Sequence, residues 1–406
     1  MSEVKEPAAT DPFFEVIRDT HWNACVGRQG NELNYVDGYM EAAQQLVTVL
    51  MDNQLFASRD TLAMPILYNA RHALELSLKF TINHLHRISA VSARHMPNHD
   101  ILSHWKYLQN ANLGDAALRQ LVQDLEPYVV SLAQIDEDGQ ELRYPTNRDG
   151  QKSLSAFGVV NLHLIRSSLD AMAKILTAVK YRVMEFELER TTGSYTKDCS
   201  RSDLKVIAEM LGAHSTWKDE SFTDKKDAVR ERFKLSSGKF SDAVDAIRRS
   251  RQLATLVELE KPLTYISDEK AIFALEQWAV ANPERPQNPE DLGMDYFNRD
   301  WEKIAKDERI SRELDQTIID NLSLEEFCDL EVLFYIGRES EFGEFYDKML
   351  TESLEEHRQE KSRWAGAHHI MAKTNFLENV IAGAHAVGRP SLAYKLRSIR
   401  PIAAVT

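Results

Sequence analysis

The chain has 406 residues, a formal net charge of −14 at neutral pH and a pI near 5.5. This length is sufficient for two or three domains. The acidic balance argues against a surface that coats nucleic acid broadly, although a local basic groove is compatible with it. Gly (16) and Pro (12) are both scarce, which favours long helices over many short strands.

Cysteine usage and the N-terminus suggest the compartment. The three cysteines, Cys25, Cys199 and Cys328, are far apart and form no Cys-x-x-Cys pair. This pattern is typical of a reducing compartment without a disulfide framework or a zinc ribbon. Residues 1–12 are polar and lack the pattern of a signal peptide, and no apolar run reaches the roughly 18 residues of a membrane span. We therefore expect a cytoplasmic protein that is not inserted in a membrane.

Hydrophobic residues recur at helical intervals in the first half of the chain. The periodicity predicts five helices, at 34–55, 62–88, 101–108, 115–135 and 157–189. Pro65 is expected near the start of the second helix, and Asn98 or Asp100 as the cap of the third. Several helices at this spacing predict a helical bundle.

The second half of the chain also reads as helical. Shorter helices are expected between residues 200 and 278, and three prolines mark residues 282–295 as a linker. The predicted organisation is all-α: a bundle at 1–195, a central helical segment at 196–281, the linker, and a C-terminal helical region at 296–406.

Two short motifs carry the strongest functional signal. In the segment from Arg71 to Lys79, Leu74 and Leu78 share one helix stripe. Glu75 and Lys79 form an acid-then-base pair one turn apart. About twenty residues later, His99 to Leu102 (His-Asp-Ile-Leu) opens the next predicted helix. We expect the Glu75–Lys79 pair to lie at the surface or in a dimer groove.

The order of these motifs resembles the HEPN superfamily (higher eukaryote and prokaryote nucleotide-binding domain) over roughly the first 190 residues. Members carry an Ala-Leu-Glu-x-x-Leu-Lys helix, similar to residues 73–79, followed by a His-Asp-Leu helix start, similar to residues 99–102. Some also carry an arginine-tyrosine-proline loop, similar to residues 142–147, before the last long helix. The resemblance implies a bundle of four or five helices that forms a homodimer.

Catalytic members of that superfamily are metal-independent ribonucleases, and the resemblance therefore implies a dimeric RNA-cleaving effector of the toxin or antiviral defence type. Their site holds an arginine followed a few residues later by a histidine, which suit phosphate binding and proton transfer. No histidine follows Arg143 at that distance. Arg94 and His99 fit the spacing and are the candidate catalytic pair. Arg363 and His368 fit it too, outside the region of resemblance.

Other interpretations stay open. The bundle could be a non-catalytic module that binds a nucleotide, or a partner protein encoded nearby. Arg143, Tyr144 and Asn147 could bind phosphate, RNA or a nucleotide, contact a partner subunit, or dock their loop on the bundle. Five histidines lie close in sequence but lack the pattern of a zinc site, so we expect neither metal nor cofactor there: His84, His86, His95, His99 and His104.

Overall fold

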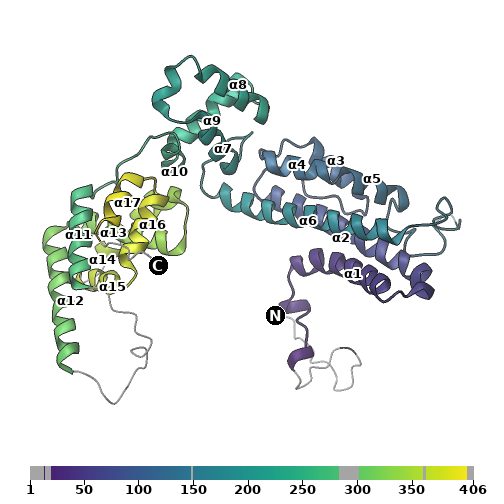
Figure 1. Cartoon of the computed structure of the whole chain (residues 1–406), viewed down its shortest axis with the longest axis horizontal. Coiled ribbons are helices and arrows are strands. Elements are labelled where there is room, and N and C mark those ends of the chain that lie inside the picture. The colour runs from purple at the N-terminus through teal and green to yellow at the C-terminus, as the bar shows by residue number, and fades with distance from the viewer. Residues whose placement is uncertain (1–12, 14–19, 148–149, 283–300, 360–362, 400–406) are drawn as a thin grey trace. The chain divides into compact units, whose positions relative to one another are not determined.

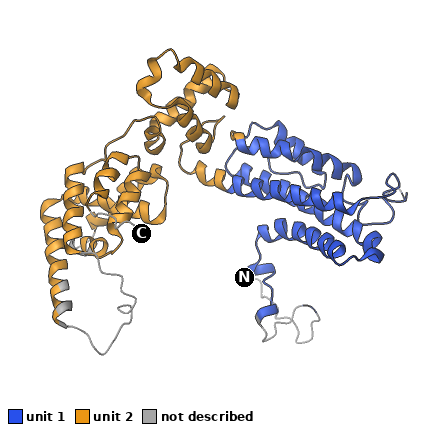
Figure 2. Ribbon diagram, viewed as in Figure 1, with its two compact units in different colours: residues 1–113, 117–184 blue, residues 114–116, 185–406 orange. Residues whose placement is uncertain are grey.

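The computed structural model describes residue 13 and residues 20–147, 150–282, 301–359 and 363–399. In this part of the chain the fold is all-α, as predicted, and the only β feature is an isolated bridge between Thr146 and Lys152. Figure 2 colours the two compact units: unit 1 comprises residues 1–113 and 117–184, and unit 2 comprises residues 114–116 and 185–406. The predicted linker lies, apart from Asn282, outside the described residues.

Unit 1 is built from six helices, labelled in Figure 1: α1 (Glu32–Asp52), α2 (Arg59–Arg87), α3 (Ile101–Asn110), α4 (Ala116–Asp124), α5 (Glu126–Ile135) and α6 (Leu162–Arg190). The first residue of α4 and the last residues of α6 belong to unit 2. The prediction of a single helix at 115–135 is wrong, because two helices, α4 and α5, lie there. The chain breaks between α4 and α5, where Pro127 occupies the first turn of α5 and has no backbone N–H to continue the preceding helix. Pro65 lies inside α2 rather than near its start.

The core of unit 1 forms where helical stripes meet. On α1 the buried residues advance by three or four positions, and α1 packs along α2: Val36, Met40, Ala43, Val47 and Leu50. Asn31 begins α1 with a capping box, and Asp100 caps α3 by accepting a hydrogen bond from the amide of Ser103 at 3.0 Å. The N-terminus of α3 therefore has a fixed position, which matters because His99 directly precedes its cap.

Unit 2 contains the remaining helices: α7 (Arg201–Leu211), α8 (Phe222–Phe233), α9 (Ser237–Arg249), α10 (Arg251–Thr255), α11 (Asp268–Ala281), α12 (Trp301–Asn321), α13 (Leu324–Glu339), α14 (Tyr346–Gln359), α15 (Arg363–Met371), α16 (Phe376–Ala386) and α17 (Pro390–Arg397). Two hydrophobic clusters occupy it, one between Cys199 and Val257 and one between Leu263 and Leu396. Helix α11, from the predicted central segment, belongs to the second cluster through Trp278. The last helix of that segment thus packs in the same core as the C-terminal helices.

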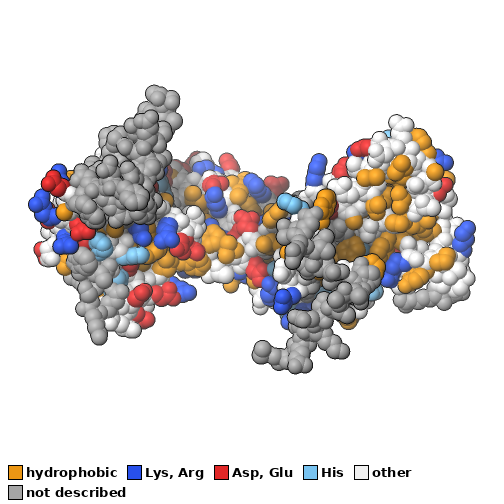
Figure 3. All heavy atoms as spheres, turned by 90° about the horizontal axis from the view of Figure 1, so that it is seen from below, with side chains coloured by type: hydrophobic (Ala, Val, Ile, Leu, Met, Phe, Trp, Pro, Cys, Tyr) orange, Lys and Arg blue, Asp and Glu red, His pale blue; other side chains and the backbone are white. Residues whose placement is uncertain are grey.

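Surface composition is mixed. Figure 3 shows one face of the molecule, on which hydrophobic side chains lie between charged ones. Exposed large hydrophobic residues on α1 and α6 include Tyr35, Leu164, Tyr181 and Met184. No helix among the described residues is apolar over a long enough stretch to cross a membrane.

Candidate functional site

A buried arginine joins three segments of unit 1. Arg71, on α2, is 1% exposed and donates from Nε to the carbonyl of Asp136 at 2.7 Å. Its Nη2 donates to the carbonyls of His99 at 2.7 Å and Glu137 at 3.0 Å. Its Nη1 donates to Oε2 of Glu75 at 3.1 Å. Arg71 therefore links α2 to the segment before α3 and to the loop after α5.

The Glu75 carboxylate is the centre of this arrangement. Each carboxylate oxygen has two neighbours that are cations or imidazoles, although the residue is only 2% exposed. Oε1 accepts from Nζ of Lys79 at 2.7 Å and from Nδ1 of His99 at 2.8 Å. Oε2 faces Arg71 and, at 3.9 Å, Nδ1 of His72. The predicted Glu75–Lys79 pair is present, but the expectation that it lies at the surface is wrong for the carboxylate.

These neighbours keep Glu75 ionised. Burial by itself raises the pKa of Glu75, because a low-dielectric environment disfavours the charged form. The nearby His72 imidazole, hydrogen bonds from Lys79 and His99, and the charge of Lys79 outweigh burial and hold the pKa of this carboxyl far below its usual range. An ionised carboxylate therefore lies beneath a partly exposed histidine at any pH near neutrality.

His99 is oriented by this carboxylate. An ionised carboxylate can only accept hydrogen bonds, so Nδ1 of His99 carries the hydrogen that Glu75 accepts. In the neutral ring the lone pair then lies on Nε2. The His99 side chain is 54% exposed, and no described residue hydrogen-bonds to its Nε2. The arrangement of a carboxylate, an oriented imidazole and an accessible second nitrogen is one that enzymes use for proton transfer.

The loop after α5 brings Arg143 to the same region. Asp136 is fully buried and accepts hydrogen bonds from the amides of residues 140–142, which closes the loop. Gly139 has φ +78°, and a Cβ there would lie 3.1 Å from Nη1 of Arg71 and 3.7 Å from Nη2 of Arg143. The two guanidinium groups therefore flank one turn of the loop, Arg71 buried and Arg143 exposed.

Aromatic rings surround the Arg143 guanidinium. It lies 5.7 Å from the ring centroid of Tyr68 and 5.5 Å from that of Tyr144, within the range of cation–π attraction. Tyr68 is also stacked on His72 at 5.7 Å, and Tyr39 meets that imidazole edge-on at 4.4 Å. Tyr144 is 52% exposed. The site therefore offers cations, imidazoles and an exposed aromatic ring on adjoining surface.

Two predicted site residues, Arg94 and Asn147, have no described contact with Arg71 or Glu75. Arg94 is exposed and makes no hydrogen bond or ion pair with any described residue, so the structure does not join it to His99. The side-chain oxygen of Asn147 accepts from the amide of Gln151 at 3.0 Å, which closes a local turn. Of the five predicted residues, His99 contacts Arg71 and Glu75 directly, Arg143 lies across Gly139 from Arg71, and Tyr144 lies next to Arg143.

The second candidate pair, Arg363 and His368, lies in unit 2, where His368 contacts a buried carboxylate. Nδ1 of His368 lies 2.8 Å from a carboxylate oxygen of Asp315 on α12, whereas the side chain of Arg363 is outside the described residues. Asp315 is fully buried, and its burial raises the pKa of this carboxyl above its usual value, although His368 opposes the rise. This pair joins α12 to α15.

Arg71 and His72 belong to the motif at residues 71–79 but were not assigned to the site from the sequence, and Asp136 was missed. Arg71 stands four residues before Glu75, and Lys79 four residues after it, so the spacing of three charges on one helix stripe was a usable signal. Nothing in the sequence indicates that this stripe faces inward. Comparisons with family models, curated proteins and solved structures found no match to this chain.

Proposed function

We propose that unit 1 binds the phosphate backbone of RNA at the surface formed by His99, Lys79 and Arg143, and cleaves it without a metal ion. The observation that carries this proposal is the hydrogen bond from exposed His99 to buried, ionised Glu75. It orients the imidazole of a half-exposed histidine, and Arg143, on the loop after α5, is suited to hold a phosphate. The resemblance to the HEPN superfamily points to the same chemistry.

The reaction needs one base and one acid. A base removes the proton of a 2′-hydroxyl, whose oxygen attacks the adjacent phosphorus. The bond from phosphorus to the 5′-oxygen breaks, and an acid protonates that oxygen, leaving a 2′,3′-cyclic phosphate and a 5′-hydroxyl. Nε2 of His99 performs one of the two transfers, Glu75 stabilises the imidazolium, and Arg143 binds the phosphate oxygens.

A homodimer forms part of the same proposal, because a second copy would supply a second His99 for the other proton transfer. Exposed hydrophobic residues on α1 and α6 support an association surface: Tyr35, Leu164, Tyr181 and Met184. The protein would act in the cytoplasm, in toxin or antiviral defence, together with a partner encoded nearby. Light scattering of the purified chain measures the oligomeric state.

The test uses purified protein and total RNA in the presence of a chelator. We expect fragments with 2′,3′-cyclic phosphate ends from the wild-type chain. His99→Asn places an amide where Nδ1 lies, so it retains the hydrogen bond to Glu75 but lacks Nε2. It should slow cleavage by about 10²- to 10⁴-fold with little change in stability. His163→Ala, at an exposed histidine on α6, is the matched control.

Variants at two arginines show which of them binds the phosphate. Arg143→Ala should reduce cleavage, whereas Arg94→Ala should leave it unchanged, because Arg94 has no described contact with the site. Full activity in His99→Asn, or equal losses in both arginine variants, would contradict the assignment.

A non-catalytic module is the second candidate. The net charge of −14 and the acids in the site loop, Glu137, Asp138 and Glu141, favour a small nucleotide or a partner protein over a long RNA. In that case the RNA incubation yields no cyclic-phosphate ends in any variant. Nucleotide binding measured by calorimetry, or capture of the partner encoded next to this chain, would then weaken in Arg143→Ala.

A further inference from the structure

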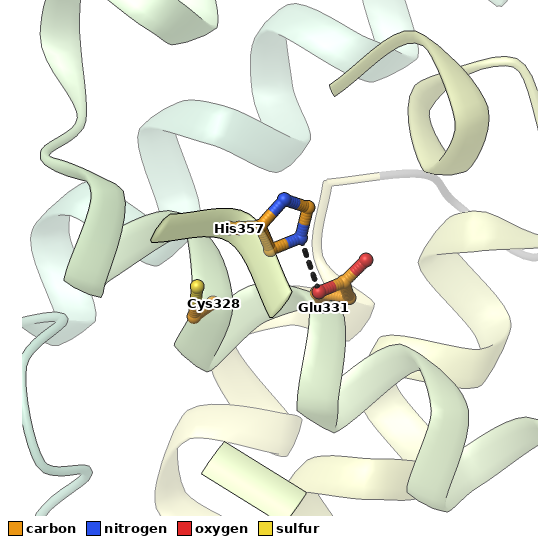
Figure 4. A group of neighbouring side chains, drawn as sticks. All are labelled: Cys328, Glu331 and His357. Carbon is orange, nitrogen blue, oxygen red and sulfur yellow. Dashed lines mark hydrogen bonds and ion pairs between the residues drawn. The ribbon is translucent and has the colours of Figure 1, made fainter. Parts of the chain in front are cut away.

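Unit 2 contains a group of side chains with metal-ligating chemistry. Cys328 and Glu331 lie three residues apart on α13, which places them on one helix face, and His357 reaches them from α14. Their sulfur, carboxylate and imidazole donor atoms all lie within 4.8 Å of one another. Figure 4 shows the three side chains in the space between the two helices. No other group of this kind occurs among the residues that the structure describes.

We propose that Cys328, Glu331 and His357 form a zinc site that joins α13 to α14. A thiolate, an imidazole nitrogen and a carboxylate oxygen are the three donor types that Zn²⁺ takes in proteins. Magnesium and calcium prefer oxygen ligands alone, so the mixed donor set selects against them. Three protein ligands leave a fourth position for water.

The geometry is close to that of a metal site. Zinc–ligand bonds of about 2.0–2.3 Å place tetrahedral donors roughly 3.5 Å apart. Nε2 of His357 lies 2.8 Å from Oε2 of Glu331, and the largest separation in the group is within 4.8 Å. The three donor atoms are therefore close enough for small side-chain rotations to bring them around one ion.

Outer contacts orient two of the ligands. The hydroxyl of Ser353 donates to Oε2 of Glu331 at 2.7 Å, and the ring of Phe327 lies edge-on to His357 at 5.5 Å. The His357 and Glu331 side chains are only 6% and 12% exposed, and Cys328 is fully buried. Such supporting contacts hold ligands in place before the metal arrives.

The surrounding charges suit a divalent cation. Burial, together with the nearby carboxylates of Glu331, Glu325 and Asp329, raises the pKa of the Cys328 thiol to about 11. A cation among these carboxylates reverses their effect and favours the thiolate. Binding then displaces the thiol proton, so zinc affinity should increase with pH.

Zinc content and a cobalt spectrum test the proposal on the full chain, with no RNA assay involved, so the result is independent of the function proposed for unit 1. After incubation with zinc chloride and dialysis against metal-free buffer, we expect one zinc ion per wild-type chain by elemental analysis. Cobalt in place of zinc should give the near-ultraviolet charge-transfer band of a cobalt–thiolate bond. Magnesium should not compete.

Variants assign the ligands. Cys328→Ser should abolish the cobalt–thiolate band, and His357→Gln should abolish stable zinc retention. Ser353→Ala removes only an outer contact and should weaken binding by about 10- to 100-fold. Cys25→Ser, at an exposed cysteine, is the control and should retain full zinc content.

Three results would overturn the proposal: a wild-type chain that retains no zinc after dialysis, a cobalt complex without a thiolate band, or equal zinc content in wild type and His357→Gln. If Cys328→Ser does not fold, the wild-type cobalt spectrum and His357→Gln decide the question.

Discussion

Replacement of the buried arginine of unit 1 is the most demanding test of the site. Arg71→Met retains most of the apolar stem but removes four hydrogen bonds. It leaves one carboxylate oxygen of Glu75 and the carbonyls of His99, Asp136 and Glu137 without this donor. A buried polar group that loses its partner costs about 1–3 kcal/mol, and breaking a buried ion pair costs about 3–5 kcal/mol. Since Lys79 still neutralises Glu75, we expect the free energy of unfolding of unit 1 to fall by about 3–5 kcal/mol.

Hydrogen exchange resolved by segment is the appropriate assay, because it reports unit 1 separately from unit 2. Amides of α2 and of the loop 136–144 should lose protection in Arg71→Met, while those of α13 and α16 keep theirs. Arg94→Met, at an exposed arginine without described contacts, is the matched control and should change stability by less than about 0.5 kcal/mol. A loss below about 1 kcal/mol in Arg71→Met would refute the view that this arginine holds the site together.

Two further predictions concern pH and packing. Because the folded pKa of Glu75 lies below its unfolded value of about 4.3, its ionised form stabilises unit 1 above that pH, and this contribution is lost as the pH falls further. Denaturant titrations between pH 5 and 3 should therefore show a steeper loss of stability in wild type than in Glu75→Gln, and equal slopes would contradict the charge network. Gly383→Ala should destabilise unit 2 by at least about 1–3 kcal/mol, since its Cβ would lie 1.9 Å from the carbonyl oxygen of Leu333 on the facing helix. Gly238→Ala, on α9, whose Cβ would meet no atom within 4 Å, should be neutral or slightly stabilising, and thermal melts of the two glycine variants measure the difference.

Periodicity located most helices of unit 1, because each buries a stripe that repeats every three or four residues. The predicted helices at 34–55 and 157–189 correspond closely to α1 and α6. The break between α4 and α5 was missed because the stripe continues across it from Val122 to Val129, while Pro127 imposes the interruption through its missing donor.

The site was only partly accessible to sequence reasoning. The Glu75–Lys79 pair follows from local spacing, since residues four apart on a helix are neighbours. The contacts of Arg71 with His99 and Asp136 join residues that are 28 and 65 positions apart, and local spacing contains no information about them. Which side of α2 faces inward depends on tertiary packing, and that decided the burial of Glu75.

The buried ion pair between Arg71 and Glu75 on α2 also has an evolutionary consequence. Loss of Arg71 removes one of the two cations that pair with the buried Glu75, and loss of Glu75 leaves the buried guanidinium with Asp136, 3.8 Å from its Nε, as its remaining carboxylate neighbour. Either change alone should destabilise unit 1, so in any lineage descended from this chain we expect substitutions at the two positions to be coupled. Gly139 should vary with them, because its missing side chain leaves room for the guanidinium. An alignment of descendants would then show coupled substitutions at Arg71 and Glu75, four residues apart on α2, and at Gly139 in the loop after α5, produced by folding alone and independent of selection for the reaction.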